Sequence, residues 1–191
     1  MFLTQNDEYQ LIALGANVAS EQGKPAHTLH LALSAVARAG LVIRAVSRFF
    51  RTPCFPVGAG PDYVNAAAQV DFDGSAADLL DRLHRIEADF GRERVQRWGA
   101  RSLDLDLLSF RGAVAPDLPT FQHWQALDPE QQAIAAPDQL ILPHPRIADR
   151  AFVLVPLNDI APDWRHPVSK QTVHEMLARR PPSEIGEITP I

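Results

Sequence analysis

The chain has 191 residues, of which 46% are hydrophobic and 21% charged, and its formal net charge at pH 7 is −5. This length predicts a single domain over residues 1–191, and the acidic balance argues against a general nucleic-acid or membrane-surface binder, because such proteins carry a basic excess. A lone cysteine, Cys54, excludes an internal disulfide and a cysteine-based zinc cluster.

The first quarter of the chain predicts strand, helix and strand in that order. Residues 1–10 turn polar after three positions, and no apolar run is long enough to span a bilayer, so we expect no signal peptide, no membrane contact and a cytoplasmic protein. The apolar run 11–14 predicts a buried strand. Residues 25–40, bounded by proline and glycine, predict an amphipathic helix, and the alternation in 41–51 predicts a second strand.

Residues 62–72 form the most legible strand of the sequence. Alternate positions carry a small apolar set on one face, while Tyr63 and Asn65 belong to the opposite, more polar face. A helix follows, with Ser75 as its N-cap and Gly91 as its C-terminal stop.

The next strand is acidic on one face. Leucine and aspartate alternate from Leu103 onward, so Asp104 and Asp106 point to the same side. An Asp-x-Asp spacing alone is more often a solvated strand edge. Four nearby arginines change that reading, because guanidinium groups bind phosphate oxygens and carboxylates suit Mg²⁺; they are Arg92, Arg94, Arg97 and Arg101.

This order of elements predicts the α+β class, as a ferredoxin-like βαββαβ sandwich with C-terminal helical additions. In that arrangement two helices cover one sheet face and leave the other open. We therefore expect the side chains of the polar faces to look out of one open sheet face, namely Tyr63, Asn65, Asp104 and Asp106. The proline-rich residues 112–139 read as an insertion.

The C-terminal part combines a proline-flanked histidine with helical segments. His144 has two readings, a structural residue or a phosphate ligand, and the neighbouring Arg146 and Arg150 favour the second. A last amphipathic helix is expected near residues 172–179, and residues 180–191 are expected to be loose.

Five segments in order resemble the 6-hydroxymethyl-7,8-dihydropterin pyrophosphokinase family, from Leu11 to about Pro167. They are Leu14-Gly15-Ala16-Asn17, Phe50-Arg51-Thr52-Pro53, Pro61-Asp62-Tyr63-Val64-Asn65-Ala66, the stretch from Arg97 to Leu107, and Pro143-His144-Pro145-Arg146 with Arg150-Ala151-Phe152-Val153-Leu154. Ala16 stands where the family usually has serine, and Ala100 where it usually has proline. Both replacements are small.

The resemblance implies an ATP-dependent diphosphokinase of folate biosynthesis, which transfers the diphosphate of ATP to the pterin hydroxymethyl group and releases AMP. It implies two Mg²⁺ ions held by Asp104 and Asp106, and a pterin ring stacked between Tyr63 and Phe152. The implied catalytic residues are Asp104, Asp106, Arg101, Arg92 and Arg94. The implied pterin-binding residues are Thr52, Cys54, Phe55, Tyr63, Asn65, Trp98, Asp104 and Phe152. The implied ATP-binding residues are Glu87, Arg94, Arg97, Trp98, Arg101, His144 and Arg150.

Three other functions are open to a chain of this kind. A non-catalytic pterin or nucleotide binding module would tolerate loss of the two aspartates, which this chain keeps. Another Mg²⁺-dependent nucleotidyl transferase would have no use for Thr52, Tyr63 and Asn65, and an RNA-binding module conflicts with the net acidity. We expect small-molecule partners, no nucleic acid, and a monomer or weak homodimer. Two roles stay open for 112–139: bracing the ATP side or self-association.

Overall fold

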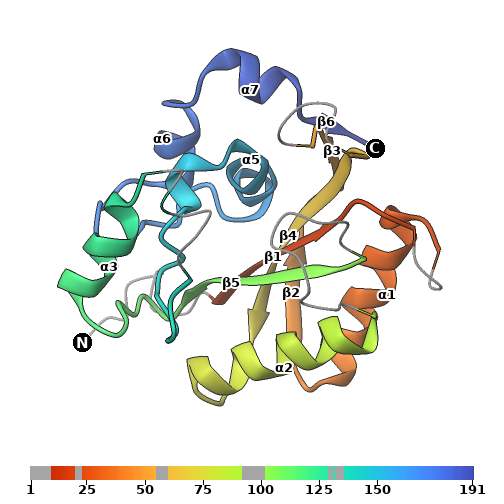
Figure 1. Cartoon of the computed structure of the whole chain (residues 1–191), viewed down its shortest axis with the longest axis horizontal. Coiled ribbons are helices and arrows are strands. Elements are labelled where there is room, and N and C mark those ends of the chain that lie inside the picture. The colour runs from red at the N-terminus through yellow and green to blue at the C-terminus, as the bar shows by residue number, and fades with distance from the viewer. Residues whose placement is uncertain (1–9, 20–22, 55–59, 92–101, 129–130, 132–135) are drawn as a thin grey trace.

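The computed structural model (Figure 1) describes residues 10–19, 23–54, 60–91, 102–128, 131 and 136–191. In chain order its elements are β1 (Gln10–Ala16), α1 (Pro25–Arg38), β2 (Val42–Val46), β3 (Phe50–Thr52), β4 (Tyr63–Asp71), α2 (Ala76–Asp89), β5 (Asp104–Phe110), α3 (Leu118–Ala126), the 3-10 helix η2 (Ile147–Asp149), α5 (Ala151–Ile160), α6 (Val173–Leu177), α7 (Pro182–Gly186) and β6 (Thr189–Pro190). The α+β class and the βαββαβ order are confirmed.

The strands form one antiparallel sheet in the order β5-β1-β4-β3-β6, and β2 also pairs with β4. The predicted single strand 41–51 is therefore two strands along the same neighbour. They are interrupted at Ser47, whose backbone N–H donates to the Ala67 carbonyl and whose hydroxyl accepts from the Ala67 N–H, both at 2.9 Å. The Ser47 hydroxyl takes the place of one backbone acceptor in the strand pairing. The sequence therefore keeps its alternation over 41–51, although the segment forms two strands.

The two sheet-packing helices begin and end where the sequence predicted. Pro25 opens α1, and Gly40 follows it with a φ of 86°. Ser75 and Asp78 form a reciprocal capping box at the start of α2. Gly91, with a φ of 76°, adopts the left-handed conformation that ends a helix.

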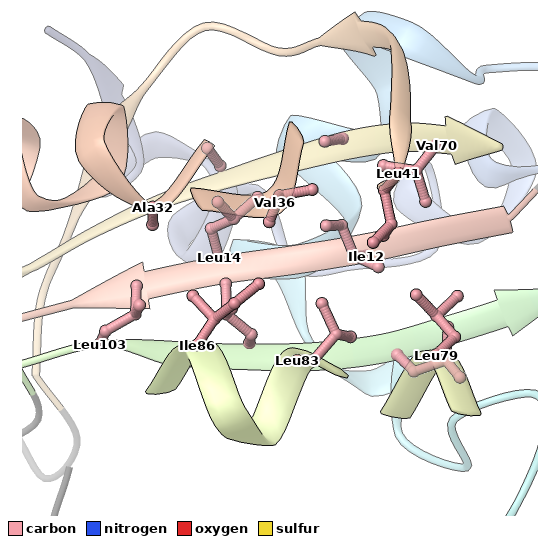
Figure 2. Packing of buried hydrophobic residues seen from close by; sticks show 14 of the residues in the cluster. Ile12, Leu14, Ala32, Val36, Leu41, Val70, Leu79, Leu83, Ile86 and Leu103 are labelled. Atoms are coloured by element: carbon pink, nitrogen blue, oxygen red, sulfur yellow. The ribbon is translucent and has the colours of Figure 1, made fainter. Parts of the chain in front are cut away.

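A first core lies between one sheet face and helices α1 and α2 (Figure 2). Its strands contribute every second residue, so Leu103, Leu105 and Leu107 of the β5 region all belong to it. Helix α2 contributes the stripe Leu79, Leu83 and Ile86, which Figure 2 shows beside β5. Burial of this continuous apolar face is the main favourable contribution to folding.

A second core covers part of the opposite face, which the sequence left open. Leu11, Ala67 and Leu108 of the sheet pack there with α5 and α6, on the side away from α1 and α2 (Figure 1). Arg48, between β2 and β3, holds α5 in place by donating to both carboxylate oxygens of Asp159, at 2.8 and 2.9 Å. The expectation that this face is left open is therefore wrong where α5 and α6 pack on it.

The C-terminal segment is ordered, so the expectation of a loose end over 180–191 is also wrong. Helix α7 contacts α5, and β6 pairs with β3 through the register Phe50↔Pro190 and Arg51↔Thr189. The predicted insertion contains α3, whose Phe121 is fully buried. No helix in the described part of the chain is long and apolar enough to cross a membrane.

Candidate active site

Three adjacent strands place Asn65, Gly15 and Asp104 in one row across the sheet. In the strand register Gly15 of β1 pairs with Asn65 of β4 on one side and with Asp104 of β5 on the other. Directly paired residues of an antiparallel sheet project to the same face, so the Asn65 amide and the Asp104 carboxylate flank a position that has no side chain. A Cβ on Gly15 would lie 2.8 Å from the Asn65 amide oxygen. Glycine at this position leaves room for the Asn65 amide oxygen.

Asp104 and Asp106 occupy the same face of β5, as their spacing predicted. Both are partly exposed, and the leucines on either side of them are buried in the first core. The two carboxylates are the hard oxygen donors that Mg²⁺ prefers, and one or two of them suffice when phosphate oxygens complete the coordination shell. The donor set therefore fits the implied metal. Among the described residues there is no cluster of three or more histidine, cysteine, aspartate or glutamate side chains around a common point.

Glu87 lies beneath this acidic strand. It is only 1% exposed, on the inner face of α2, and its Oε1 accepts a 2.7 Å hydrogen bond from the backbone N–H of Leu105. β5 is the last strand at its side of the sheet, so Glu87 supplies the partner that a further strand would otherwise give. The Glu87 side chain thus holds the backbone of Leu105, the residue between Asp104 and Asp106, in place.

The polar end of β4 joins Asn65 to Thr52. The Asn65 amide nitrogen donates to the Thr52 hydroxyl at 2.6 Å, and both side chains are buried. Tyr63 pairs with Thr52 in the ladder and is partly exposed. Cys54, two residues after Thr52, is buried with its Sγ 2.9 Å from the Gly60 carbonyl oxygen and 3.2 Å from the Gly60 nitrogen.

His144 is tied to the acidic strand. Its backbone N–H donates to the Leu108 carbonyl at 2.8 Å, and its Nδ1 accepts the Arg146 backbone N–H at 3.1 Å. Burial, together with the nearby positive charge of Arg150, lowers the pKa of His144 to about 3, while the charge of Asp104 opposes this. The imidazole is therefore neutral at physiological pH. Because Nδ1 is an acceptor, the proton sits on Nε2.

Arg150 and Phe152 flank the start of α5. Arg150 is the N-cap residue, and its guanidinium carbon lies 5.7 Å from the centre of the Phe152 ring. Phe152 is 40% exposed, which is unusual for a large aromatic side chain in an otherwise apolar helix. The hydrogen bond from the His144 N–H to the Leu108 carbonyl joins the proline-flanked segment to β5, and α5 begins directly after Arg150, six residues further along the chain.

The structure brings part of the sequence-predicted set together and leaves part undescribed. Thr52 and Asn65 contact each other, and the register places Asn65 in line with Asp104. Six other predicted residues lie outside the described residues; they are Phe55, Arg92, Arg94, Arg97, Trp98 and Arg101. The sequence analysis assigned Gly15 no physical role. Its position at the end of an apolar strand, two residues before Asn17, was the feature that could have pointed to one.

Comparison with known proteins decides the family. The sequence model of 7,8-dihydro-6-hydroxymethylpterin-pyrophosphokinase (HPPK) matches residues 11–162. The chain belongs to the HPPK family. It is 34% identical over 178 residues to the 2-amino-4-hydroxy-6-hydroxymethyldihydropteridine pyrophosphokinase of Methylorubrum extorquens, covering 93% of this chain and 96% of that protein. The Pseudomonas aeruginosa protein of the same name is 36% identical over 171 residues, covering 89% and 90% respectively.

Solved structures agree on the HPPK fold. A Plasmodium falciparum HPPK-DHPS structure superimposes with a TM-score of 0.62 at 16% identity and covers 93% of this chain. The present chain spans 45% of that longer chain, so the likeness concerns the fold of one part of it. As an HPPK family member, the chain is an ATP-dependent diphosphotransferase of folate biosynthesis.

Proposed function

We propose that this chain transfers the diphosphate group of ATP to the hydroxymethyl group of 6-hydroxymethyl-7,8-dihydropterin, and that it does so where β4, β1 and β5 lie side by side. The observation that carries this placement is the row of Asn65, Gly15 and Asp104. It puts a neutral hydrogen-bonding amide and a carboxylate on opposite sides of a glycine. A flat polar ring and a charged phosphate chain require those two different surroundings.

The pterin binds on the Asn65 side. Thr52 and Asn65 are buried and already bonded to each other, so their remaining hydrogen-bonding capacity is held in a fixed direction for the polar edge of the ring. Tyr63 and the exposed Phe152 are the aromatic side chains that stack on its faces. Cys54 and Phe55, through their backbone groups, and Trp98 complete the proposed set.

ATP binds on the Asp104 side. Asp104 and Asp106 would hold two Mg²⁺ ions, whose positive charge would offset the negative charge of the ATP phosphates. The neutral His144 donates from Nε2 to a phosphate oxygen, and Arg150 supplies a charged donor beside it. Glu87, which is buried, acts on the ATP side through its bond to the Leu105 N–H. The further ATP-side residues are Arg94, Arg97, Trp98 and Arg101, and Arg92 and Arg94 join Arg101 as catalytic residues.

The reaction itself requires positioning more than covalent help from the protein. The pterin hydroxyl oxygen attacks the β-phosphorus and its proton is lost to water, while the bond from that phosphorus to the α,β-bridging oxygen breaks and AMP leaves with that oxygen. Holding the two substrates on neighbouring strands lowers the entropic part of the barrier. We assign no general base.

The test is to incubate the protein with ATP, Mg²⁺ and the reduced hydroxymethylpterin and to identify the nucleotide product. We expect AMP in equal amount to the pterin diphosphate, and ADP or inorganic phosphate as the main product would refute the proposal. Asp104→Ala and Asp106→Ala should abolish turnover without unfolding the protein. Asp73→Ala is the matched control, since Asp73 is an exposed carboxylate that lies 3.9 Å from the Arg111 guanidinium. The cytoplasmic location and the monomer or weak homodimer stay predictions.

A further inference from the structure

The side chain of Arg146 joins the insertion helix α3 to the His144 segment. The Arg146 Nη1 donates to the backbone carbonyl of Gln125 at 3.2 Å, and its Nη2 lies 2.7 Å from the Asp149 carboxylate. The side chain is 19% exposed, so these contacts are largely shielded from solvent. No feature of the proposed reaction accounts for this arginine.

The position of Gln125 explains why a cation is held there. Gln125 is in the last turn of α3, where carbonyl groups have no intrahelical partner and carry the negative end of the helix dipole. A guanidinium group donates a charge-assisted hydrogen bond to such a carbonyl, and its positive charge interacts favourably with the negative end of the dipole. Arg146 therefore completes the C-terminus of α3 as a capping side chain supplied from a distant segment.

Helix α3 is itself firmly anchored, so it can serve as a support. Phe121 on its inner face is fully buried, with its ring centre 5.7 Å from that of His166. Asp117 caps its N-terminus by accepting the Thr120 N–H at 2.8 Å. The ends of the insertion are joined by a pair of backbone hydrogen bonds between Ala115 and Leu142, at 2.9 and 3.0 Å.

The backbone of the same arginine contacts the imidazole. Its N–H donates to His144 Nδ1 at 3.1 Å, the bond that leaves the histidine proton on Nε2. One residue thus bonds to α3 with its side chain and to His144 with its backbone. Loss of the side-chain anchor frees the turn from 144 to 146 and with it the orientation of the imidazole.

We propose that Arg146 is a positioning residue that couples the insertion helix α3 to His144 and so fixes the imidazole for ATP. This assigns the insertion the role of a brace on the ATP side. The inference rests on the proposed function of His144 as a phosphate ligand. It does not place the Arg146 side chain in contact with substrate.

The test is a double-mutant cycle read by calorimetric binding of α,β-methylene ATP with Mg²⁺. Arg146→Ala should weaken binding about tenfold, the loss expected for one charge-assisted hydrogen bond, and leave binding of the pterin alone unchanged. Arg146→Lys should recover part of the affinity, because an ammonium can still donate to the Gln125 carbonyl. In the His144→Ala background the further change Arg146→Ala should have almost no effect, since the side chain through which it acts is gone.

The control is Arg44→Ala, which removes an exposed arginine paired with Asp71 and should leave affinity unchanged. Persistence of the full Arg146→Ala loss in the His144→Ala background would overturn the inference, because the arginine would then act on ATP directly. Equal loss of pterin affinity would overturn it as well, since that would indicate a general structural effect. Failure of the proposed function is a separate result, namely absence of AMP with the unaltered protein.

Discussion

The amide oxygen of Asn65 lies 2.8 Å from the point that a Cβ on Gly15 would occupy. Real Cβ atoms do not approach an oxygen so closely, and Asn65 cannot turn aside easily because its nitrogen is bonded to Thr52 at 2.6 Å. We therefore predict that Gly15→Ala displaces the amide and raises KM for the pterin about fivefold, the equivalent of one hydrogen bond. KM for ATP should change less.

The matched control for that substitution is Gly186→Ala. Gly186 ends α7, and no atom lies within 4 Å of the Cβ that alanine would add. Its kinetic constants should equal those of the unaltered chain. A Gly15→Ala protein with normal pterin kinetics would show that the Asn65 amide does not hold the ring.

The bond from Leu105 N–H to Glu87 predicts a difference between two substitutions of the same acid. Glu87→Ala leaves a buried N–H without its partner, which costs about 1–3 kcal/mol of unfolding free energy in addition to the lost packing. Glu87→Gln keeps a carbonyl oxygen for that N–H and should lose less. Urea unfolding of the three proteins measures the difference, and equal losses would contradict the assignment.

The alternation of single residues allowed the site face to be predicted. Leu103, Leu105 and Leu107 could only be placed inside, which put Asp104 and Asp106 outside together. The same argument placed Tyr63 and Asn65. Strand register brought Asn65 and Asp104 into one row, and register depends on pairing between distant segments, which a single sequence does not display.

What the sequence could not show depends on contacts between distant segments. Helix α5 is apolar on most sides, with Val153, Leu154 and Leu157 all buried, so its pattern does not reveal which surface it covers. Residues 180–191 lack a regular spacing of apolar side chains, and their position is set by the pairing of Thr189 and Pro190 with β3. Neither contact leaves a local signal.

Two histidines with lowered pKa values predict a loss of stability in acid. His166 is 2% exposed, its Nδ1 accepts the N–H groups of Val168 and Ser169 at 3.2 Å, and burial lowers its pKa to about 4, with a smaller contribution from Lys170. The pKa of His144 is lowered to about 3. Between pH 6.5 and 4 the unfolded chain binds protons that the folded chain does not. The unfolding free energy should therefore fall by about 1.4 kcal/mol for each histidine and each unit by which the pH is lowered.

The variant that tests this pH dependence is His166→Asn. Its amide oxygen can accept the same N–H groups, but it does not titrate. Urea unfolding at several pH values from 7.5 to 4.5 should show that the unfolding free energy of this variant depends less steeply on pH. The difference in slope should equal the contribution of one histidine. An unchanged slope would mean that His166 is not the group responsible.

The last prediction concerns β6, which completes the edge of the strand that carries Thr52. Strand β3 has three residues, and its outer edge is bonded to β6 and to the Ile191 N–H, which donates to the Phe49 carbonyl at 3.0 Å. A chain shortened to residues 1–187 loses these bonds and should hold Thr52 and Asn65 less firmly. We expect KM for the pterin to rise about threefold, roughly 0.6 kcal/mol, with KM for ATP unchanged. Ile191→Ala is the control, because its side chain is 56% exposed and the backbone bond remains. An unchanged pterin KM in the shortened chain, or an equal rise for ATP, would show that β6 does not support the pterin side.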